Sequence, residues 1–234
     1  MGFFSKKKKE TRIYFITGTD TGVGKTLVCS ALLQAVNKAN LTSVALKPVA
    51  AGCEMTDQGL VNDDALELQA NMSIELGYED INPIALESAI APHIAAAETD
   101  LNIDIEELAE HCRAMTHDAD VMLIEGAGGW RVPLNEDQYM SDLVKALDVP
   151  VIIVVAMRLG CINHALLTAE AIRSDGLQVA GWVANCVTAE NMPALGDNLL
   201  ALRDRMEAPF LGFLPYLENV DPSQVAPYLE ISYL

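Results

Sequence analysis

The fold of this chain is indicated most directly by the stretch GTDTGVGKT (Gly18–Thr26). It follows a β-branched, apolar run and precedes a stretch whose apolar residues recur at helical spacing, so it is a glycine-rich loop between a strand and a helix. Glycines let several backbone amides point inward, and a helix start adds its positive end. Lys25 brings a positive charge to the β- and γ-phosphates, and the Thr26 hydroxyl is suited to ligate Mg²⁺. The loop therefore predicts binding of a nucleoside triphosphate with Mg²⁺.

This loop departs at one place from the pattern G-x-x-x-x-G-K-[ST]. The pattern puts its first glycine at position 19, where this chain has Thr19, and the glycine is Gly18 instead. The alternative is an ordinary glycine-rich turn, but the G-K-T triplet, the spacing and the strand–loop–helix context agree on phosphate binding. The loop alone does not indicate which reaction follows.

The rest of the chain repeats a β-branched run followed by a helical stretch. Strands are expected at Arg12–Thr17, Ser43–Lys47, Val121–Glu125, Val151–Met157 and Gln178–Asn185, and helices at Lys25–Asn40, Asp64–Asn71, Ile105–Met115, Ser141–Leu147, Asn163–Ser174 and Ala194–Arg205. This alternation predicts an α/β fold of the P-loop type, a mostly parallel, doubly wound sheet with helices on both faces. Ligands of such sheets bind beyond the carboxyl ends of the strands. We expect a single domain over residues 11–234 and a basic, disordered tail over residues 1–10.

Composition excludes several classes of protein. Of the 234 residues, 51% are hydrophobic, and 15 Lys and Arg face 33 Asp and Glu, a net charge of −18. The apolar fraction suffices for a core, and the charge argues against nucleic-acid and anionic-membrane partners. The longest apolar run, Val149–Met157, is about half of a membrane span. The five scattered cysteines form no CxxC pair, so reduced thiols and a cytoplasmic location are expected.

Acidic and basic residues stand where strands end. Glu125 ends an apolar run and is followed by glycines, which favours a metal ligand at the edge of the sheet. Asp63 and Asp64 stand at the start of a predicted helix, and either is a metal ligand or a helix cap. Lys47 ends the second strand, either as a second cation that stabilises a transferring phosphoryl group or as a strand-end lysine that reaches solvent.

Several separated blocks of the chain occur in the order found in one family. They are GTDTGVGKT (Gly18–Thr26), KPVAAG (Lys47–Gly52), DALELQ (Asp64–Gln69), APHIAA (Ala91–Ala96), EGAGGW (Glu125–Trp130), LGCINHALLT (Leu159–Thr168), GWVAN (Gly181–Asn185) and LGFLPYL (Leu211–Leu217). With these blocks, the chain resembles the dethiobiotin synthetases, the ATP-dependent carboxylase-cyclases of biotin synthesis. The resemblance runs from about Tyr14 to about Tyr216, so it covers most of the chain.

The resemblance implies a reaction and a set of partners. The substrates would be 7,8-diaminononanoate, CO₂ and ATP, with Mg²⁺ as cofactor. One amine would form a carbamate, ATP would phosphorylate it to a carbamic–phosphoric anhydride, and the second amine would close the cyclic urea with release of ADP and phosphate. The enzyme would be a homodimer whose substrate site lies at the subunit interface.

The resemblance also implies roles for individual residues. Thr26, Asp64 and Glu125 would hold Mg²⁺, which favours Asp64 over Asp63, and Lys47 and Lys25 would be the catalytic cations. The implied nucleotide site comprises Gly22, Val23, Gly24, Lys25, Thr26, Leu27, Asp64, Glu125, Gly126, Ala127, Gly128, Asn185, Leu214, Pro215 and Tyr216. Within it, Asn185 would recognise the adenine edge and Leu214–Tyr216 would cover the base. The implied substrate site comprises Thr21, Lys47, Ala51, Gly160, Cys161 and Asn163.

The stretch Leu159–Asn163 stands just before a predicted helix, where free amides suit a carboxylate. In the family it belongs to the other subunit and holds the carboxylate tail of the substrate. Many members have serine where this chain has Ala51, which puts one substrate contact in doubt. Trp130 and Arg131 either line the substrate channel or cap the edge of the sheet, and His93 and His164 favour structural roles.

Two other functions fit a phosphate loop. A regulatory or partitioning ATPase of the same superfamily usually carries a second lysine early in the loop, where this chain has Thr19–Thr21. An amidating enzyme of the cobyrinate type would need a glutamine-hydrolysing domain, for which 234 residues leave little room. Fold alone cannot separate the three. The order of the blocks and the position of Lys47 favour the synthetase.

Overall fold

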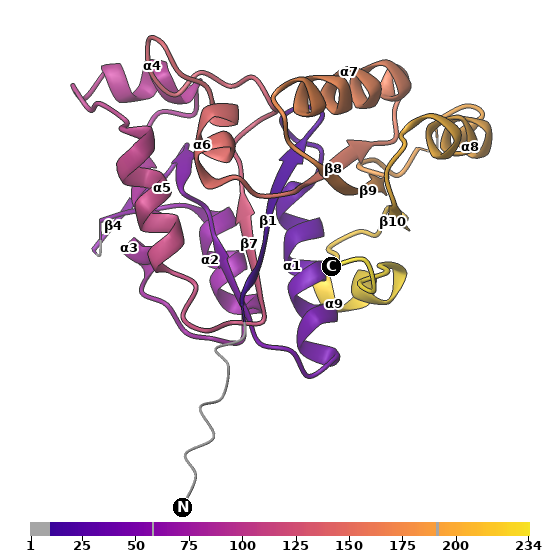
Figure 1. Cartoon of the computed structure of the whole chain (residues 1–234), viewed down its shortest axis with the longest axis horizontal. Coiled ribbons are helices and arrows are strands. Elements are labelled where there is room, and N and C mark those ends of the chain that lie inside the picture. Colours follow the sequence, from indigo (N-terminus) through magenta and orange to yellow (C-terminus); the bar gives the residue numbers. More distant parts are fainter. Residues whose placement is uncertain (1–9, 58, 191) are drawn as a thin grey trace, which may run out of the picture.

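The computed structural model describes residues 10–57, 59–190 and 192–234 (Figure 1). The basic tail expected over residues 1–10 lies, apart from Glu10, outside these described residues. A large parallel sheet forms the centre of the described chain, and helices flank it. This arrangement confirms the doubly wound α/β fold that the alternating sequence pattern predicts.

The central sheet has six strands in the order β10-β9-β8-β1-β7-β2, and each neighbouring pair is parallel. The strands are β1 (Arg12–Gly18), β2 (Ser43–Leu46), β7 (Val121–Glu125), β8 (Val151–Ala156), β9 (Val179–Asn185) and β10 (Phe210–Leu214). β1 lies at the centre, because Phe15 pairs with Ile124 of β7 on one side and with Val151 of β8 on the other. The phosphate loop therefore leaves the middle of the sheet.

Helices cover both faces of the sheet. They are α1 (Lys25–Lys38), α2 (Asp63–Asn71), α3 (Tyr78–Ile81), α4 (Pro92–Ala97), α5 (Ile105–Ala114), α6 (Met140–Leu147), α7 (Cys161–Ser174), α8 (Leu195–Arg205) and α9 (Pro222–Val225), and Ala226–Tyr228 form a 3-10 turn. Phe15 packs in the core with residues of α5, α6 and α7, whereas its neighbour Ile16 packs in the core with residues of α1 and α9. Successive strand residues point to opposite faces, so a strand buried on both faces is apolar throughout.

Two smaller sheets extend the chain beyond the end of β2. β3 (Val49–Ala51) pairs with β6 (Ile84–Leu86) in parallel, and β4 (Glu54–Thr56) pairs with β5 (Gly59–Val61) antiparallel. Each of these strands has three residues, which is too short to show a periodicity in sequence. β3, β4 and β5 carry the chain from Lys47 to α2, and thus bring Asp64 back to the edge of the central sheet, whereas β6 follows α3.

The predicted elements agree with the structure except at some of their ends. The predicted strands end within one residue of the observed ones and the helices within two. Lys47 stands one residue beyond β2 rather than inside it. The expected start of a helix at Asn163 is wrong, because α7 already begins at Cys161 with Gly160 as its N-cap. Gly160 has a left-handed backbone, with φ of 96°, and this conformation starts the helix earlier than the spacing of the apolar residues indicates.

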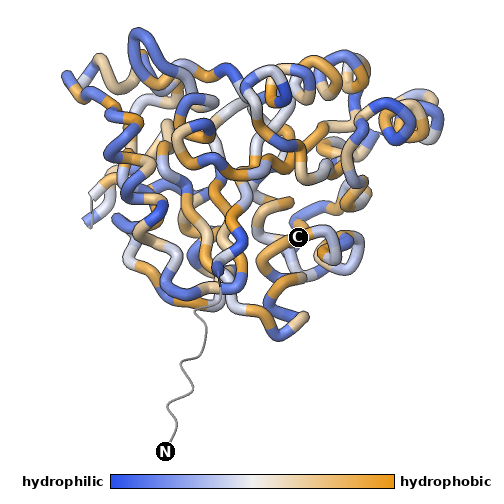
Figure 2. The backbone as a smooth tube through the Cα atoms, viewed as in Figure 1, coloured by the Kyte–Doolittle hydropathy of each residue, from blue (hydrophilic) through white to orange (hydrophobic). Residues whose placement is uncertain are grey.

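The hydropathy of the backbone follows this architecture (Figure 2). Apolar residues concentrate along the central strands, while the outer helices and loops alternate between polar and apolar residues. The described strands β7 and β8 are buried along their whole lengths. In the described residues, every helix is too short or too polar to cross a membrane.

Candidate functional site

The phosphate loop joins β1 to α1 as the sequence predicts. Gly22 and Gly24 have φ of 70° and 82°, which favours glycine at both positions. At Gly24 space is limiting as well, because a Cβ atom there would lie 2.2 Å from Nδ2 of Asn185. Asn185 Nδ2 donates a hydrogen bond to the Val23 carbonyl at 2.9 Å. The end of β9 therefore braces the loop.

Asn185 has a second feature beyond this brace. Its side chain is 2% exposed, and its Oδ1 atom is buried with no hydrogen-bond partner among the described residues. An unpaired buried amide oxygen is costly unless something else donates to it. The position thus retains one acceptor beside the phosphate loop.

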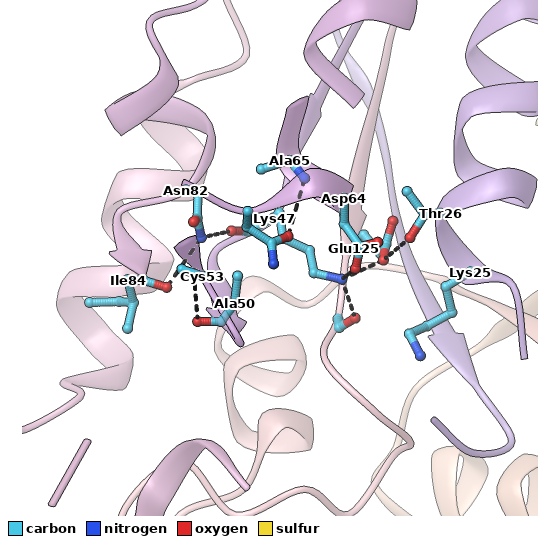
Figure 3. Close-up of polar contacts among 12 residues, drawn as sticks. Lys25, Thr26, Lys47, Ala50, Cys53, Asp64, Ala65, Asn82, Ile84 and Glu125 are labelled. Atoms are coloured by element: carbon cyan, nitrogen blue, oxygen red, sulfur yellow. Dashed lines mark hydrogen bonds and ion pairs between the residues drawn. The ribbon is translucent and has the colours of Figure 1, made fainter. Parts of the chain in front are cut away.

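Lys47 connects two carboxylates at the edge of the sheet (Figure 3). Its Nζ lies 2.8 Å from Oδ2 of Asp64 and 2.5 Å from Oε1 of Glu125. The Thr26 hydroxyl donates to the same Glu125 oxygen at 3.0 Å. Lys47 is 4% exposed and Glu125 is fully buried. Four residues from four separate segments therefore converge, as we expect where the carboxyl ends of parallel strands meet.

The carboxylates and the two lysines influence one another's ionisation. Burial disfavours the charged form of Lys47, but Glu125 and Asp64 outweigh burial and raise its pKa. Burial likewise opposes ionisation of Asp64, and the Lys47 ammonium outweighs it and lowers the pKa of Asp64. Burial, and then repulsion by Lys47, lowers the pKa of Lys25 to about 8. Lys47 therefore stays protonated and charged, whereas the charged form of Lys25 is stabilised when an anion binds beside it.

The start of α2 determines which aspartate faces Lys47. The N-cap is Asn62, whose Oδ1 accepts from the Ala65 amide at 3.3 Å, so neither aspartate caps the helix. Asp64 in the first turn reaches Lys47, while Asp63 is exposed. The alternative of a capping aspartate is therefore wrong.

These residues fit a Mg²⁺ ion. Oε2 of Glu125 is buried without a hydrogen-bond partner among the described residues, so this carboxylate keeps one free acceptor. With Asp64 and the Thr26 hydroxyl it forms a set of oxygen donors, which suits a hard cation. Among the described residues, no group of three or more His, Cys, Asp or Glu side chains is arranged to hold a metal ion. Mg²⁺ does not need them, because it commonly takes its other ligands from phosphates and water.

A cavity of about 810 Å³ opens beside this group. Its lining residues are Thr21, Gly22, Gly24, Lys25, Thr26, Lys47, Ala50, Ala51, Asn62, Asp64, Ala89, Ile90, Ala91, Pro92, Glu125, Ala127, Gly128, Arg131, Val132 and Pro133. The sequence did not indicate Asn62, nor Ala89, Ile90, Val132 and Pro133, which form an apolar part of the lining. Small apolar side chains carry no chemical signature, and only their closeness to the blocks beginning at Ala91 and Glu125 could have suggested them.

Other expected site residues do not line this cavity. They are Val23, Leu27, Gly126, Gly160, Cys161, Asn163, Asn185, Leu214, Pro215 and Tyr216. Val23 and Leu27 belong to the loop and the first turn of α1, and Leu214 pairs with Asn185 across β10 and β9. Tyr216 is 41% exposed beyond the end of β10. Asn185 and Leu214 therefore lie at the ends of β9 and β10, while the Gly126 carbonyl lies 3.5 Å from Nζ of Lys47 and Gly160, Cys161 and Asn163 lie at the start of α7.

The stretch around Cys161 differs from expectation. Cys161 is buried in the first turn of α7, its amide donates to the Arg158 carbonyl at 3.0 Å, and burial raises the pKa of its thiol. The expected stretch Leu159–Asn163 therefore includes the first turn of α7 rather than lying wholly before it, and the Cys161 amide is already bonded within the chain. The preceding Leu159 is 91% exposed.

Trp130 and Arg131 share one partner, Asp175 at the end of α7. The Trp130 indole nitrogen donates to Oδ2 of Asp175 at 2.7 Å, and the Arg131 guanidinium donates to Oδ1 at 2.9 Å. Trp130 is buried against Phe15, whereas Arg131 also lines the cavity. Trp130 therefore closes the edge of the sheet, and Arg131 both closes it and borders the site. His93 lies outside the cavity lining, although Pro92 belongs to it.

A strand, a glycine-rich loop and a helix that presents Lys25 and Thr26, set in a parallel sheet, define a P-loop nucleotide-binding protein. A family model described as an AAA domain matches residues 12–224. The solved structures of MinD from Pyrococcus furiosus and from Pyrococcus horikoshii, the latter complexed with Mg-ADP, have TM-scores of 0.53 and 0.52 at 20% and 18% identity. Both cover 88% of this chain, and the chain covers 84% and 82% of them. At this identity the likeness shows the fold alone.

Curated relatives specify the family within this class. The ATP-dependent dethiobiotin synthetase of Cellvibrio japonicus is 51% identical over 95% of this chain and 97% of that protein. The enzymes of the same name from Marinobacter nauticus and Pseudomonas aeruginosa are each 50% identical, over 94% and 93% of this chain and 97% and 96% of their own lengths. The chain belongs to the dethiobiotin synthetase family and is an enzyme of the ligase type.

Proposed function

We propose that this enzyme carboxylates 7,8-diaminononanoate with CO₂ at the expense of ATP and closes the cyclic urea of dethiobiotin. The observation that carries the proposal is the buried Lys47 ammonium, held by Asp64 and Glu125 beside a phosphate loop and an apolar-walled cavity. A phosphate-binding loop alone would serve any nucleotide hydrolase. A second buried cation at the same edge supports transfer of the γ-phosphoryl group to an anionic acceptor.

The reaction has three steps. One amine adds to CO₂ and forms a carbamate, whose oxygen then attacks the γ-phosphorus of ATP and gives a carbamic–phosphoric anhydride and ADP. The second amine attacks the carbamoyl carbon, phosphate leaves and the five-membered urea closes. Because the two amines stand on adjacent carbons, the last step is intramolecular and strongly favoured.

In this reaction, Lys47 and Lys25 would offset the negative charge of the carbamate and the triphosphate. The carbamate and the triphosphate bring several negative charges into one cavity of a chain whose net charge is −18. The raised pKa of Lys47 keeps its ammonium charged where the carbamate would lie. Lys25 begins α1 and lies next to the glycine loop, where it would contact the β- and γ-phosphates.

Thr26, Asp64 and Glu125 would hold Mg²⁺. A bound Mg²⁺ would offset the negative charge of the β- and γ-phosphates. Gly22 to Leu27 would cradle the phosphates, and Glu125 to Gly128 would border them. The unpaired Oδ1 of Asn185 supports recognition of an amino group on the adenine edge, with Leu214–Tyr216 over the base.

The diamine would enter between the phosphate loop and the apolar wall. Thr21 and Ala51 line the cavity together with Lys47, and Ile90 and Val132 would offer an apolar path for the alkyl chain. Gly160, Cys161 and Asn163 lie outside the cavity of their own chain. Their position supports a homodimer in which they meet the substrate carboxylate of the other subunit. A cytoplasmic location stays a prediction from the cysteine pattern.

The proposal is tested with purified protein, diaminononanoate, bicarbonate, Mg²⁺ and ATP. Dethiobiotin and phosphate should accumulate in equal amounts, and Lys47→Ala should abolish both. Phosphate release that does not depend on the diamine would instead indicate a simple ATPase, and absence of dethiobiotin above the Lys47→Ala control would contradict the proposal. Only the fold likeness to MinD points to a partitioning ATPase, and we propose no second function.

A further inference from the structure

Lys47 is fixed at its backbone as well as at its ammonium. Its amide donates to the Ile81 carbonyl at 2.9 Å. Its carbonyl accepts from Nδ2 of Asn82 at 2.7 Å (Figure 3). Both partners lie at the end of α3, a short helix that the sequence analysis did not predict. The end of α3 thus determines where the Lys47 side chain begins.

Asn82 is connected to α2 through one hydroxyl group. Tyr78 Oη donates to Oδ1 of Asn82 at 2.9 Å and accepts from the backbone amide of Asn62 at 2.7 Å. Asn62 caps α2, the helix that presents Asp64. Asn82 and Asn62 are 3% and 8% exposed, so water does not readily replace either contact.

These contacts form a closed ring around the site. The ring runs from the Lys47 carbonyl through Asn82 and Tyr78 to Asn62, along the backbone to Asp64, and back through the 2.8 Å ion pair to the Lys47 ammonium. Tyr78 and Asn82 do not line the cavity. They are therefore in a position to affect the site through Lys47 and through Asn62, which lines the cavity and caps the helix that presents Asp64.

We propose that Tyr78 and Asn82 are positioning residues that fix the distance between the Lys47 ammonium and the Asp64 carboxylate. Their effect falls on binding of Mg²⁺ and on the chemical step, since both depend on where these two groups lie. Partners that orient metal-binding side chains commonly change metal affinity or activity by about 10–100-fold when removed. This inference rests on the proposed function for its catalytic part and on the ring alone for its binding part.

The test uses Tyr78→Phe, which removes only the hydroxyl, and Asn82→Asp, which removes the donor to Lys47. Tyr228→Phe is the matched control, because Tyr228 is 52% exposed and lies far along the chain in the 3-10 turn. Calorimetry measures binding of a non-hydrolysable ATP analogue as Mg²⁺ is varied. Steady-state assays measure kcat and the KM for the diamine. Hydrogen exchange reports on the amides at the start of α2.

We expect Tyr78→Phe to raise the Mg²⁺ concentration needed for half-maximal binding by about tenfold and to lower kcat by a similar factor. The KM for the diamine should stay within about twofold, and exchange at the start of α2 should rise. Asn82→Asp should act in the same direction, and Tyr228→Phe should leave all four quantities unchanged.

A purely structural role for Tyr78 would give a different result. Tyr78→Phe would then lower the melting temperature while the folded protein kept its Mg²⁺ requirement and kcat, and this result would overturn the inference. Binding of the ATP analogue to the wild-type protein that does not depend on Mg²⁺ would overturn the inference as well. If wild type made no dethiobiotin but Tyr78→Phe still shifted the Mg²⁺ requirement, the proposed function would fail and the positioning role would stand.

Discussion

At the scale of single residues, the site depends on a buried lysine between two carboxylates. An isolated buried charge is costly. These three charges are tolerated because the Lys47 ammonium lies 2.5 Å from the Glu125 carboxylate and 2.8 Å from the Asp64 carboxylate. The sequence indicates which residue types stand at the strand ends. It leaves Asp63 and Asp64 equivalent, because only the Asn62 cap and the path of the chain through β4 and β5 turn Asp64 toward Lys47.

Replacement of Lys47 tests this arrangement. Lys47→Met removes the cation and leaves Glu125 buried with uncompensated charge, so unfolding in urea without Mg²⁺ should require about 3 kcal/mol less free energy. The rate of product formation should fall by about 10²–10³-fold, the range for loss of one group that stabilises developing charge. Unchanged stability would contradict the buried ion pair, and unchanged kcat would contradict the catalytic role.

Two glycines of the phosphate loop provide a matched pair. Both have positive φ, but a Cβ atom at Gly24 would meet Asn185 Nδ2 at 2.2 Å, whereas Gly22 has no heavy atom within 4 Å of such a Cβ among the described residues. Gly22→Ala should cost about 1–2 kcal/mol of stability from the left-handed backbone alone. Gly24→Ala should cost more and should also weaken ADP binding, as measured by urea unfolding and calorimetry. Equal effects of the two substitutions would contradict the close packing of the loop on Asn185.

At the scale of elements, the sequence predicts what is long and regular. β7 and β8 are recognisable because strands buried on both faces are apolar throughout, and α1 because its apolar residues recur over 14 residues. β3 to β6 and α3 have three or four residues each, so no period develops. The Lys47–Asp64–Glu125 group was predictable from strand ends and family resemblance. The apolar wall and the Tyr78 ring were not, because they depend on these short elements.

The packing of α5 makes a prediction about thiol chemistry. Cys112 is fully buried on α5, and burial raises the pKa of its thiol to about 12. Burial disfavours the thiolate, so between pH 7 and pH 9 this thiol should stay protonated and resist alkylation in the native protein. Mass spectrometry after brief iodoacetamide treatment should find Cys186, which is partly exposed, modified before Cys112. Modification of Cys112 at the same rate would show that α5 opens readily.

At the scale of the whole molecule, the excess of acidic residues means that an anion can bind only where the site supplies local positive charge. A chain of net charge −18 repels an anion such as ATP at long range, and Lys25 and Lys47 offset that repulsion within the cavity. A homodimer would place Gly160 and Asn163 of the partner subunit at the open side of this cavity. The 91% exposed Leu159 beside them is consistent with a surface that is covered in an assembly.

Mixing of inactive variants tests the shared site. Lys47→Ala and Asn163→Ala homodimers should each lose most activity. After they are unfolded and refolded together, half of the dimers should be mixed, and one of the two sites in each should be intact. If the protein is the proposed homodimer with twofold symmetry, about a quarter of wild-type activity should return. No recovery, together with a monomeric sedimentation profile, would contradict a substrate site built from two subunits.

In the proposed reaction, the carbamate oxygen takes the γ-phosphoryl group of ATP at the Lys47 site. Brief turnover with ¹⁸O-labelled CO₂ and diaminononanoate, followed by mass analysis of both products, tests it directly. One labelled oxygen should appear in each inorganic phosphate released and one in the urea carbonyl of dethiobiotin, and neither should form with Lys47→Ala. Dethiobiotin accompanied by unlabelled phosphate would contradict transfer of the γ-phosphoryl group to the carbamate oxygen.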